Sequence, residues 1–362
     1  MKLPMSKTAM RMQCPGSRLM CESYSTPQSE YAIEGSSAHK LIELMFKGLP
    51  VEGSNFSEEM WDGWELWHEV LKSYLGWDTC EIEKEVEWSY DGFFVCGRVD
   101  FYAYSKEKNE IVVAEYKFGH SPVRVYENWQ LINNLYGIMA DNLVDKARLH
   151  DLKCRFIVVQ PRNYSSTDRG VQYWTTSYSA LHPYFEEIKR SERGSVATHA
   201  QRRVGSECKF CSGRYVCDAL RESALTALEQ AYVGEPDILS DLAAGVEMRL
   251  LKRAVEIINY RLRGLEIQIT EALRKGKVVP GYVLQQTTGR TVWGVSDVEI
   301  VALGELMGVP LTKPSFITPK QAVSKGIPLE LVESMSTVAV GSMKLVCDDV
   351  ESRKNIFKQK QP

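Results

Sequence analysis

The stretch that decides this fold runs from Gly97-Arg98-Val99-Asp100-Phe101 to Ala114-Glu115-Tyr116-Lys117-Phe118-Gly119. Apolar and aromatic runs at 93–104 and 111–118, separated by a polar turn at 105–109, predict two strands joined as a hairpin. Side chains alternate along a strand, so Glu115 and Lys117 share a face that Asp100 on the neighbouring strand can reach. Charged groups on a half-buried hairpin are costly unless something needs them.

A divalent cation with a phosphate would use these three groups. Carboxylate oxygens hold Mg²⁺ or Mn²⁺, and a lysine can face the phosphate or the attacking water. The alternative is an edge hairpin whose charged face lies in solvent, with Glu115 and Lys117 as an ordinary ion pair. Because Asp…Glu-x-Lys is a short pattern, only other features of the chain can decide between the two.

The composition is that of an ordinary soluble globular protein. The 362 residues are 44% hydrophobic and 25% charged, which is enough for one large domain or two moderate ones. A formal net charge of −3 gives no global basic field toward nucleic acid, although a local groove can still be basic. The sequence has no apolar run as long as a membrane span and no signal-peptide pattern, so we expect a cytoplasmic protein without a membrane partner.

Around the hairpin, helical and strand patterns alternate over residues 1–220. We expect helices after Gly35-Ser36-Ser37 and over 58–75, 126–147 and 181–190, and strands over 80–88, 153–160 and 171–175. This order predicts a mixed α/β domain with helices packed on a sheet. Residues 221–362 are expected to form a mainly helical extension with a small hairpin at 283–286 and 290–293.

A histidine lies in the helix expected after the Gly-Ser-Ser segment. With Ser36 or Ser37 as the N-cap, His39 falls in the first turn. A single histidine in such a place is usually a surface residue, so the helix pattern alone gives it no role.

Three clustered cysteines form a second candidate site. Cys208, Cys211 and Cys217 lie within ten residues, and thiolates so close repel one another unless a metal or cluster takes up their charge. In a reducing compartment a disulfide framework is not expected. Three unliganded thiols in a loop are the simplest alternative.

The fourth ligand of such a site is open. His199 could complete a zinc site of three cysteines and one histidine. Cys14, or less favourably Cys21, could instead complete a four-cysteine cluster. A cluster closed from Cys14 would connect the first residues to the end of the α/β domain over a very long loop, for which the closure entropy is large.

Taken together, these motifs follow one another in a specific order over residues 10–220. They are Cys14-Pro15, Gly35-Ser36-Ser37-Ala38-His39, Gly97-Arg98-Val99-Asp100, Glu115-Tyr116-Lys117, Gln130 and Cys208-x2-Cys211-x5-Cys217. In this order the chain resembles the RecB-like branch of the PD-(D/E)XK nuclease superfamily. The resemblance is to its iron–sulfur members: AddB-type nuclease domains, CRISPR-associated adaptation exonucleases and a related phage-encoded group.

The resemblance implies a fold and an activity. The fold is a restriction-endonuclease-like core sheet flanked by helices, here at residues 1–220, with 221–362 as the extension. The activity is that of a metal-dependent deoxyribonuclease, expected to be an exonuclease. It would hydrolyse phosphodiester bonds at DNA ends or in single strands, in phage or bacterial recombination or DNA processing. The implied partners are DNA and a recombination or annealing protein, in the cytoplasm of a bacterial host if the gene is phage-encoded.

The resemblance also assigns roles residue by residue. His39, Asp100 and Glu115 match the ligands of Mg²⁺ or Mn²⁺, Lys117 matches the catalytic lysine, and Gln130 matches the glutamine of a Q-x3-Y motif. Cys14, Cys208, Cys211 and Cys217 match the ligands of a structural 4Fe-4S cluster, with zinc as the less favoured occupant.

The sequence departs from the family at the end of the Q-x3-Y motif. The residue four positions after Gln130 is Asn134, and Tyr136 follows two further on. Either Tyr136 substitutes from a shifted register or this DNA contact is missing. The rival readings are a non-catalytic DNA-binding or assembly module that keeps the fold and cluster, and a zinc-stabilised scaffold. The non-catalytic module would be favoured if the carboxylates failed to converge, and iron–sulfur absorbance would separate the cluster from zinc.

Overall fold

The structure is a computed structural model. It describes residues 2–25, 30–51, 56–141, 143–163, 170–231, 241–313, 315–316, 319, 322 and 327–347. Contacts divide the chain into two compact units, Met1–Gly264 and Leu265–Pro362. The boundary between these units falls inside helix α8 (Asp241–Arg274). One reason is that the Arg261 guanidinium on this helix donates a hydrogen bond to the Tyr215 carbonyl, which joins this part of α8 to the first unit.

The first unit contains a mixed six-stranded sheet. Its strands are β1 (Lys2–Pro4), β2 (Thr79–Tyr90), β3 (Phe93–Ser105), β4 (Glu110–Tyr116), β5 (Lys153–Val159) and β6 (Val171–Ser177). The antiparallel pairs are β2–β3, β3–β4 and β5–β6, whereas β4–β5 and β1–β3 are parallel. The hairpin predicted from residues 93–118 is confirmed as β3 and β4, with Phe101 opposite Ala114.

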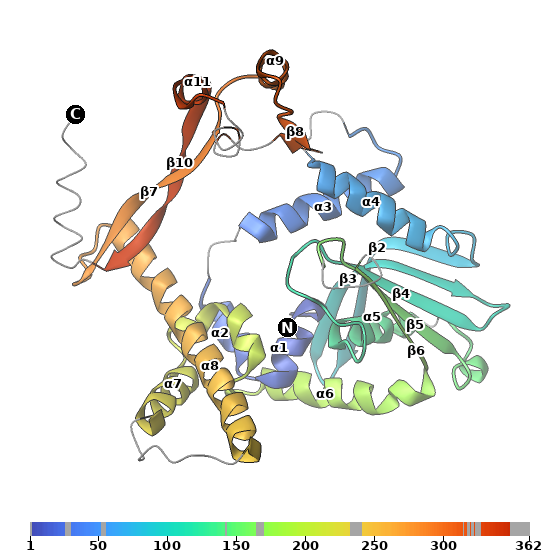
Figure 1. Cartoon of the computed structure of the whole chain (residues 1–362). Coiled ribbons are helices and arrows are strands. Elements are labelled where there is room, and N and C mark those ends of the chain that lie inside the picture. The colour runs from blue at the N-terminus through green and yellow to red at the C-terminus, as the bar shows by residue number, and fades with distance from the viewer. Residues whose placement is uncertain are drawn as a thin grey trace. The chain divides into compact units, whose positions relative to one another are not determined.

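Helices cover both faces of this sheet (Figure 1). Helices α3 (Glu30–Phe46) and α4 (Glu58–Leu71) pack on one face, and α5 (Trp129–Ala140) and α6 (His182–Val196) pack on the other. The unit also contains α1 (Thr8–Gln13), α2 (Ser17–Ser23) and α7 (Asp218–Ala231). Alternate strand residues enter two separate cores: Phe101 and Ala103 pack with α3 and α4, whereas Tyr102 and Tyr104 pack with α5 and α6. The predicted mixed α/β core flanked by helices is therefore confirmed.

Helix α3 begins earlier than its sequence predicts. It starts at Glu30, so Ser36 and Ser37 lie inside the helix, where their hydroxyls donate hydrogen bonds to the Ala32 and Ile33 carbonyls. A serine that bonds back to the preceding turn can sit within a helix instead of capping it. His39 is consequently a mid-helix residue, and the expected position in the first turn is wrong.

The N-terminal residues belong to the core of the first unit. Leu3 and Met5 are almost fully buried, and Met5 packs against Gly97 of β3. The buried Arg11 guanidinium on α1 forms an ion pair with the buried Glu192 carboxylate on α6, with Nη2 2.6 Å from Oε1. Removing either partner would leave the other charge buried and unpaired, which strongly destabilises the fold. The pair therefore holds α1 against α6.

The second unit is smaller and contains a two-stranded sheet. β7 (Tyr282–Trp293) pairs antiparallel with β10 (Ser336–Cys347). Between these strands lie α9 (Asp297–Met307), β8 (Thr312–Lys313), β9 (Ser315–Phe316) and α11 (Leu329–Met335). The hairpin expected at 283–286 and 290–293 is wrong, because both segments belong to one strand whose partner lies far along the chain. Among the described helices, none combines the length and apolar character needed to cross a membrane.

Candidate active site

The two predicted carboxylates lie where the β3–β4 ladder ends. Phe101 and Ala114 form its last pair at this end, so Asp100 and Glu115 are the next residues along each strand. Both are buried, at 6% and 4% exposure. The Tyr116 backbone N–H donates to Asp100 Oδ2 over 2.8 Å, which fixes this carboxylate and leaves Oδ1 facing the site.

Lys117 and Gln130 surround the second carboxylate. The Lys117 ammonium donates to Glu115 Oε1 at 2.5 Å and to Gln130 Oε1 at 3.3 Å. Gln130 Nε2 in turn donates to Glu115 Oε1 at 2.7 Å. The Asn128 side chain caps helix α5 by accepting hydrogen bonds from the Gln130 and Leu131 N–H groups, so the helix N-terminus sets the position of Gln130.

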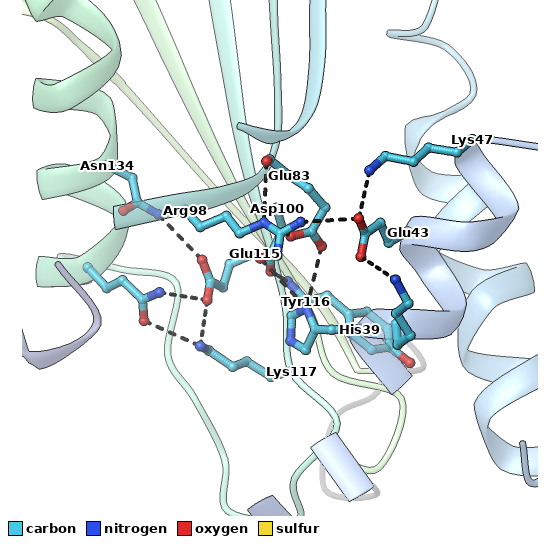
Figure 2. A network of polar contacts seen from close by, with 12 residues as sticks. His39, Glu43, Lys47, Glu83, Arg98, Asp100, Glu115, Tyr116, Lys117 and Asn134 are labelled. Carbon is cyan, nitrogen blue, oxygen red and sulfur yellow. Dashed lines mark hydrogen bonds and ion pairs between the residues drawn. The ribbon is translucent and has the colours of Figure 1, made fainter. Parts of the chain in front are cut away.

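His39 reaches the site from α3, on the other face of the sheet. Its Nδ1 lies 3.7 Å from Asp100 Oδ1, and its ring packs edge-on against Tyr116 with centroids 5.5 Å apart. The structure thus brings all five predicted side chains, His39, Asp100, Glu115, Lys117 and Gln130, into one polar network. Figure 2 shows His39, Asp100, Glu115 and Lys117 in this network.

The pKa shifts in this network show that its charges are coupled. Burial, reinforced by the charge of Glu115, raises the pKa of Asp100 to about 7, although His39 and Lys117 act in the opposite direction. Burial lowers the pKa of His39, but Asp100 and Glu83 outweigh it and raise this pKa to about 9. Burial also opposes the charge of Lys117, yet Glu115 and Asp100 raise its pKa above the ordinary value. At neutral pH the metal-free site therefore holds a histidinium and an ammonium beside its acids.

Asn134 and Tyr136, the two residues involved in the departure from the Q-x3-Y motif, lie in different surroundings. Asn134 lies one turn after Gln130 on the same face of α5, and its Nδ2 is 3.5 Å from Glu115 Oε2. Tyr136 instead stacks on Phe185, 4.8 Å away, and packs edge-on against Trp88. Tyr136 is therefore a core residue, and the site presents a carboxamide where the family motif has a tyrosine.

Glu83 is a site residue that the sequence did not reveal. Its Oε1 lies 3.8 Å from His39 Nδ1, and one ligand atom each of His39, Glu83 and Asp100 lie within 4.8 Å of one another. The sequence around it, Glu81-Ile82-Glu83-Lys84-Glu85-Val86-Glu87, repeats glutamate at every second position, so no local signal separates Glu83 from the others. Only its position opposite Asp100 in the β2–β3 ladder does.

The clustered cysteines meet the N-terminus around one cavity. Four thiols line it: Cys14, Cys208, Cys211 and Cys217. The Arg203 N–H donates to the Cys14 sulfur at 3.3 Å, and the Gly205 N–H donates to the Cys208 sulfur at 3.5 Å. Burial raises the pKa of the thiols of Cys14 and Cys208, so both thiols are protonated at neutral pH.

The two other candidate ligands lie outside this cavity. Cys21 is half-buried beside it, with its Sγ 3.6 Å from Met10 Sδ. His199 is exposed and lines a different surface pocket with Thr198 and Asp218.

Comparison with known proteins identifies a family of unknown function. A family model described as "Protein of unknown function (DUF2800)" matches residues 77–304, which is more than half of the chain. No curated protein matches the chain.

Two crystal structures are similar in part. That of SSO0001 is 16% identical with a TM-score of 0.32, over 60% of this chain and 86% of that one. That of a protein described as "Putative exonuclease" from Eubacterium rectale is 15% identical with a TM-score of 0.35, over 67% and 93%. At these TM-scores neither similarity carries an argument about activity.

Proposed function

This chain belongs to the DUF2800 family of proteins of unknown function, and we propose that it is a metal-dependent deoxyribonuclease. The observation that supports this proposal is the meeting of two buried carboxylates, a lysine and a histidine at one end of the sheet. Buried like charges destabilise a fold unless a cation or a hydrogen-bond network compensates them. Perturbed titratable groups that converge in this way are typical of active sites.

The residues present fit a divalent cation. His39, Asp100 and Glu115 would hold Mg²⁺ or Mn²⁺, which would supply Lewis-acid activation and neutralise charge on the scissile phosphate. Asp100 Oδ1 faces His39, and among the described residues Glu115 Oε2 has only the long contact with Asn134, so both acids keep an oxygen for an ion.

The protein's own groups would position and stabilise the reacting phosphate. Lys117 is protonated, because the acids around it raise its pKa, and it can donate hydrogen bonds to a phosphate oxygen or to the attacking water. Gln130 contacts both Lys117 and Glu115 and so fixes the ammonium relative to the carboxylate. The Asn128 cap would keep this geometry rigid.

For the cysteines we propose a structural 4Fe-4S cluster held by Cys14, Cys208, Cys211 and Cys217. Support comes from the shared cavity and from the N–H groups that donate to two of the sulfurs. His199 does not line the cavity, so a zinc site of three cysteines and one histidine is not supported. Four thiolates can also hold zinc, which is the less favoured occupant because the ordered motifs resemble those of iron–sulfur members. The cluster would connect the chain's beginning to the end of the α/β core and take no part in hydrolysis.

The proposal of a particular nuclease branch and mode of cleavage rests on the ordered sequence motifs. These favour a RecB-like PD-(D/E)XK enzyme, an exonuclease acting on DNA ends or single strands, with a recombination or annealing protein as its partner. A cytoplasmic location follows from the same proposal.

The test is cleavage of end-labelled single- and double-stranded DNA with Mg²⁺ or Mn²⁺. We expect the parent protein to cleave, and Asp100→Ala and Lys117→Ala to lose at least about a hundredfold in rate while remaining folded. Lys106→Ala, which changes an exposed lysine in the β3–β4 turn, is the matched control and should cleave like the parent. Unchanged cleavage in both site variants would remove the assignment. DNA binding without cleavage under either metal would favour the non-catalytic module.

A further inference from the structure

A third carboxylate, that of Glu83, lies in the site, and the backbone of this residue is strained. It lies in β2 between Ile82, which pairs with Phe101, and Lys84, which pairs with Val99, so it stands opposite Asp100. Its backbone has φ of 51°, in the left-handed region. A glutamate rarely adopts this conformation, which costs about 1–2 kcal/mol. Strained non-glycine residues outside turns cluster at active sites and ligand-binding sites.

The two oxygens of this carboxylate have different surroundings. The side chain is 6% exposed, and Oε2 lies 2.8 Å from the Arg98 Nε. Oε1 is buried, accepts no hydrogen bond from the described residues, and forms only a long ion pair with His39 Nδ1, 3.8 Å away. Arg98 therefore satisfies one oxygen, whereas the other lacks a hydrogen bond. A buried carboxylate oxygen without a donor is costly, which indicates that another group satisfies it in the working protein.

We propose that Glu83 is a direct ligand of the divalent cation, in addition to His39, Asp100 and Glu115. This inference rests on the proposed metal-dependent function and extends its ligand set to a residue on β2. Arg98 would hold Glu83 by Oε2 and leave Oε1 for the ion (Figure 2). One nitrogen and several carboxylate oxygens make a hard site, suited to Mn²⁺ or Mg²⁺.

The test measures binding of Mn²⁺ alone, without DNA, by the paramagnetic resonance signal of the free ion. We expect Glu83→Gln, which keeps the shape and removes the charge, to weaken Mn²⁺ binding at least tenfold. Glu85→Gln, an exposed carboxylate two residues along the same strand, is the matched control and should bind like the parent. Asp100→Asn reports whether the ion occupies this site at all, and it should also lose binding.

The outcomes separate the two proposals. If Asp100→Asn loses Mn²⁺ and Glu83→Gln binds like the parent, the role of Glu83 is overturned and the proposed function stands. If the parent itself binds no Mn²⁺, both proposals fail together. If Glu83→Gln does not fold, Glu83→Asp is the alternative variant. It keeps the charge but shortens the side chain, which moves the carboxylate away from the ion. It should bind Mn²⁺ more weakly than the parent, and equal binding overturns the inference.

Discussion

At His39, a proton and a metal ion compete for the same ring. Asp100 and Glu83 hold the pKa of this histidine at about 9 in the metal-free protein, so the ring is protonated at neutral pH. A metal binds only the neutral imidazole, and binding must therefore release this proton. We expect the affinity for Mn²⁺ to rise with pH between about 6.5 and 8.5, by up to about tenfold per pH unit for each proton displaced. Anaerobic titration at several pH values measures this rise.

The control for this prediction is His39→Gln. It removes the ring that titrates while leaving Asp100, whose raised pKa of about 7 lies lower. We expect this variant to bind Mn²⁺ more weakly, and its affinity to rise less with pH than that of the parent, because no proton on residue 39 is displaced. An affinity of the parent that stays constant over the whole range would contradict the proposed ligand role of His39.

At the scale of the elements, the site depends on how closely α4 approaches β4. A Cβ on Gly63 of α4 would lie 2.3 Å from the Tyr116 hydroxyl, and this buried tyrosine packs against His39. Alanine favours a helix over glycine by up to about 1 kcal/mol, but overpacking a core costs about 1–3 kcal/mol. We expect Gly63→Ala to lower the free energy of unfolding by about 1–2 kcal/mol, measured by denaturant titration.

Gly35→Ala on the neighbouring helix α3 is the matched control. A Cβ there would meet nothing within 4 Å, so only the gain in helix propensity remains. This variant should be unchanged or more stable by up to about 1 kcal/mol. Equal effects of the two substitutions would show that the approach of α4 does not constrain Tyr116.

Local patterns predicted the elements better than their long-range pairings. The strands predicted at 93–104 and 111–118 match β3 and β4 to within two residues at each end. They could be predicted because the pattern of a strand is local in the sequence. The start of α3 was missed, because a serine that caps and a serine that bonds back within a helix look alike in sequence. The partner of β7 was missed because β10 lies more than forty residues away.

The residues of the site were also predicted where sequence motifs identify them and missed where only tertiary position does. The ordered motifs identified His39, Asp100, Glu115, Lys117 and Gln130, and the structure brings them together. Glu83 is one of four alternating glutamates, and only its tertiary position opposite Asp100 distinguishes it. Asn134 was noticed only as a departure from a motif, and its contact with Glu115 depends on how α5 packs on the sheet.

At the scale of the whole molecule, the cysteine cavity joins the two ends of the α/β core. Cys14 follows α1, whereas Cys208, Cys211 and Cys217 precede α7. A cross-link over so long a loop removes much of the freedom of the unfolded chain, by about 5 kcal/mol in the chain-entropy model. We expect Cys208→Ala to lower the melting temperature of anaerobically purified protein and to remove its iron and visible absorbance, as measured by metal analysis and spectroscopy.

Cys96→Ala is the matched control for this prediction, because Cys96 is a half-buried thiol on β3 that does not line the cavity. It should keep the metal and lose at most about 1 kcal/mol. Cleavage offers a second readout: a structural cluster predicts that any Cys208→Ala protein still folded at low temperature keeps its Mn²⁺-dependent activity, since Lys117 and the carboxylates lie outside the cavity. A Cys208→Ala protein that melts like the parent would contradict the stabilising role. Zinc in place of iron in the parent would contradict an iron–sulfur cluster, whereas the proposed four cysteine ligands would stand.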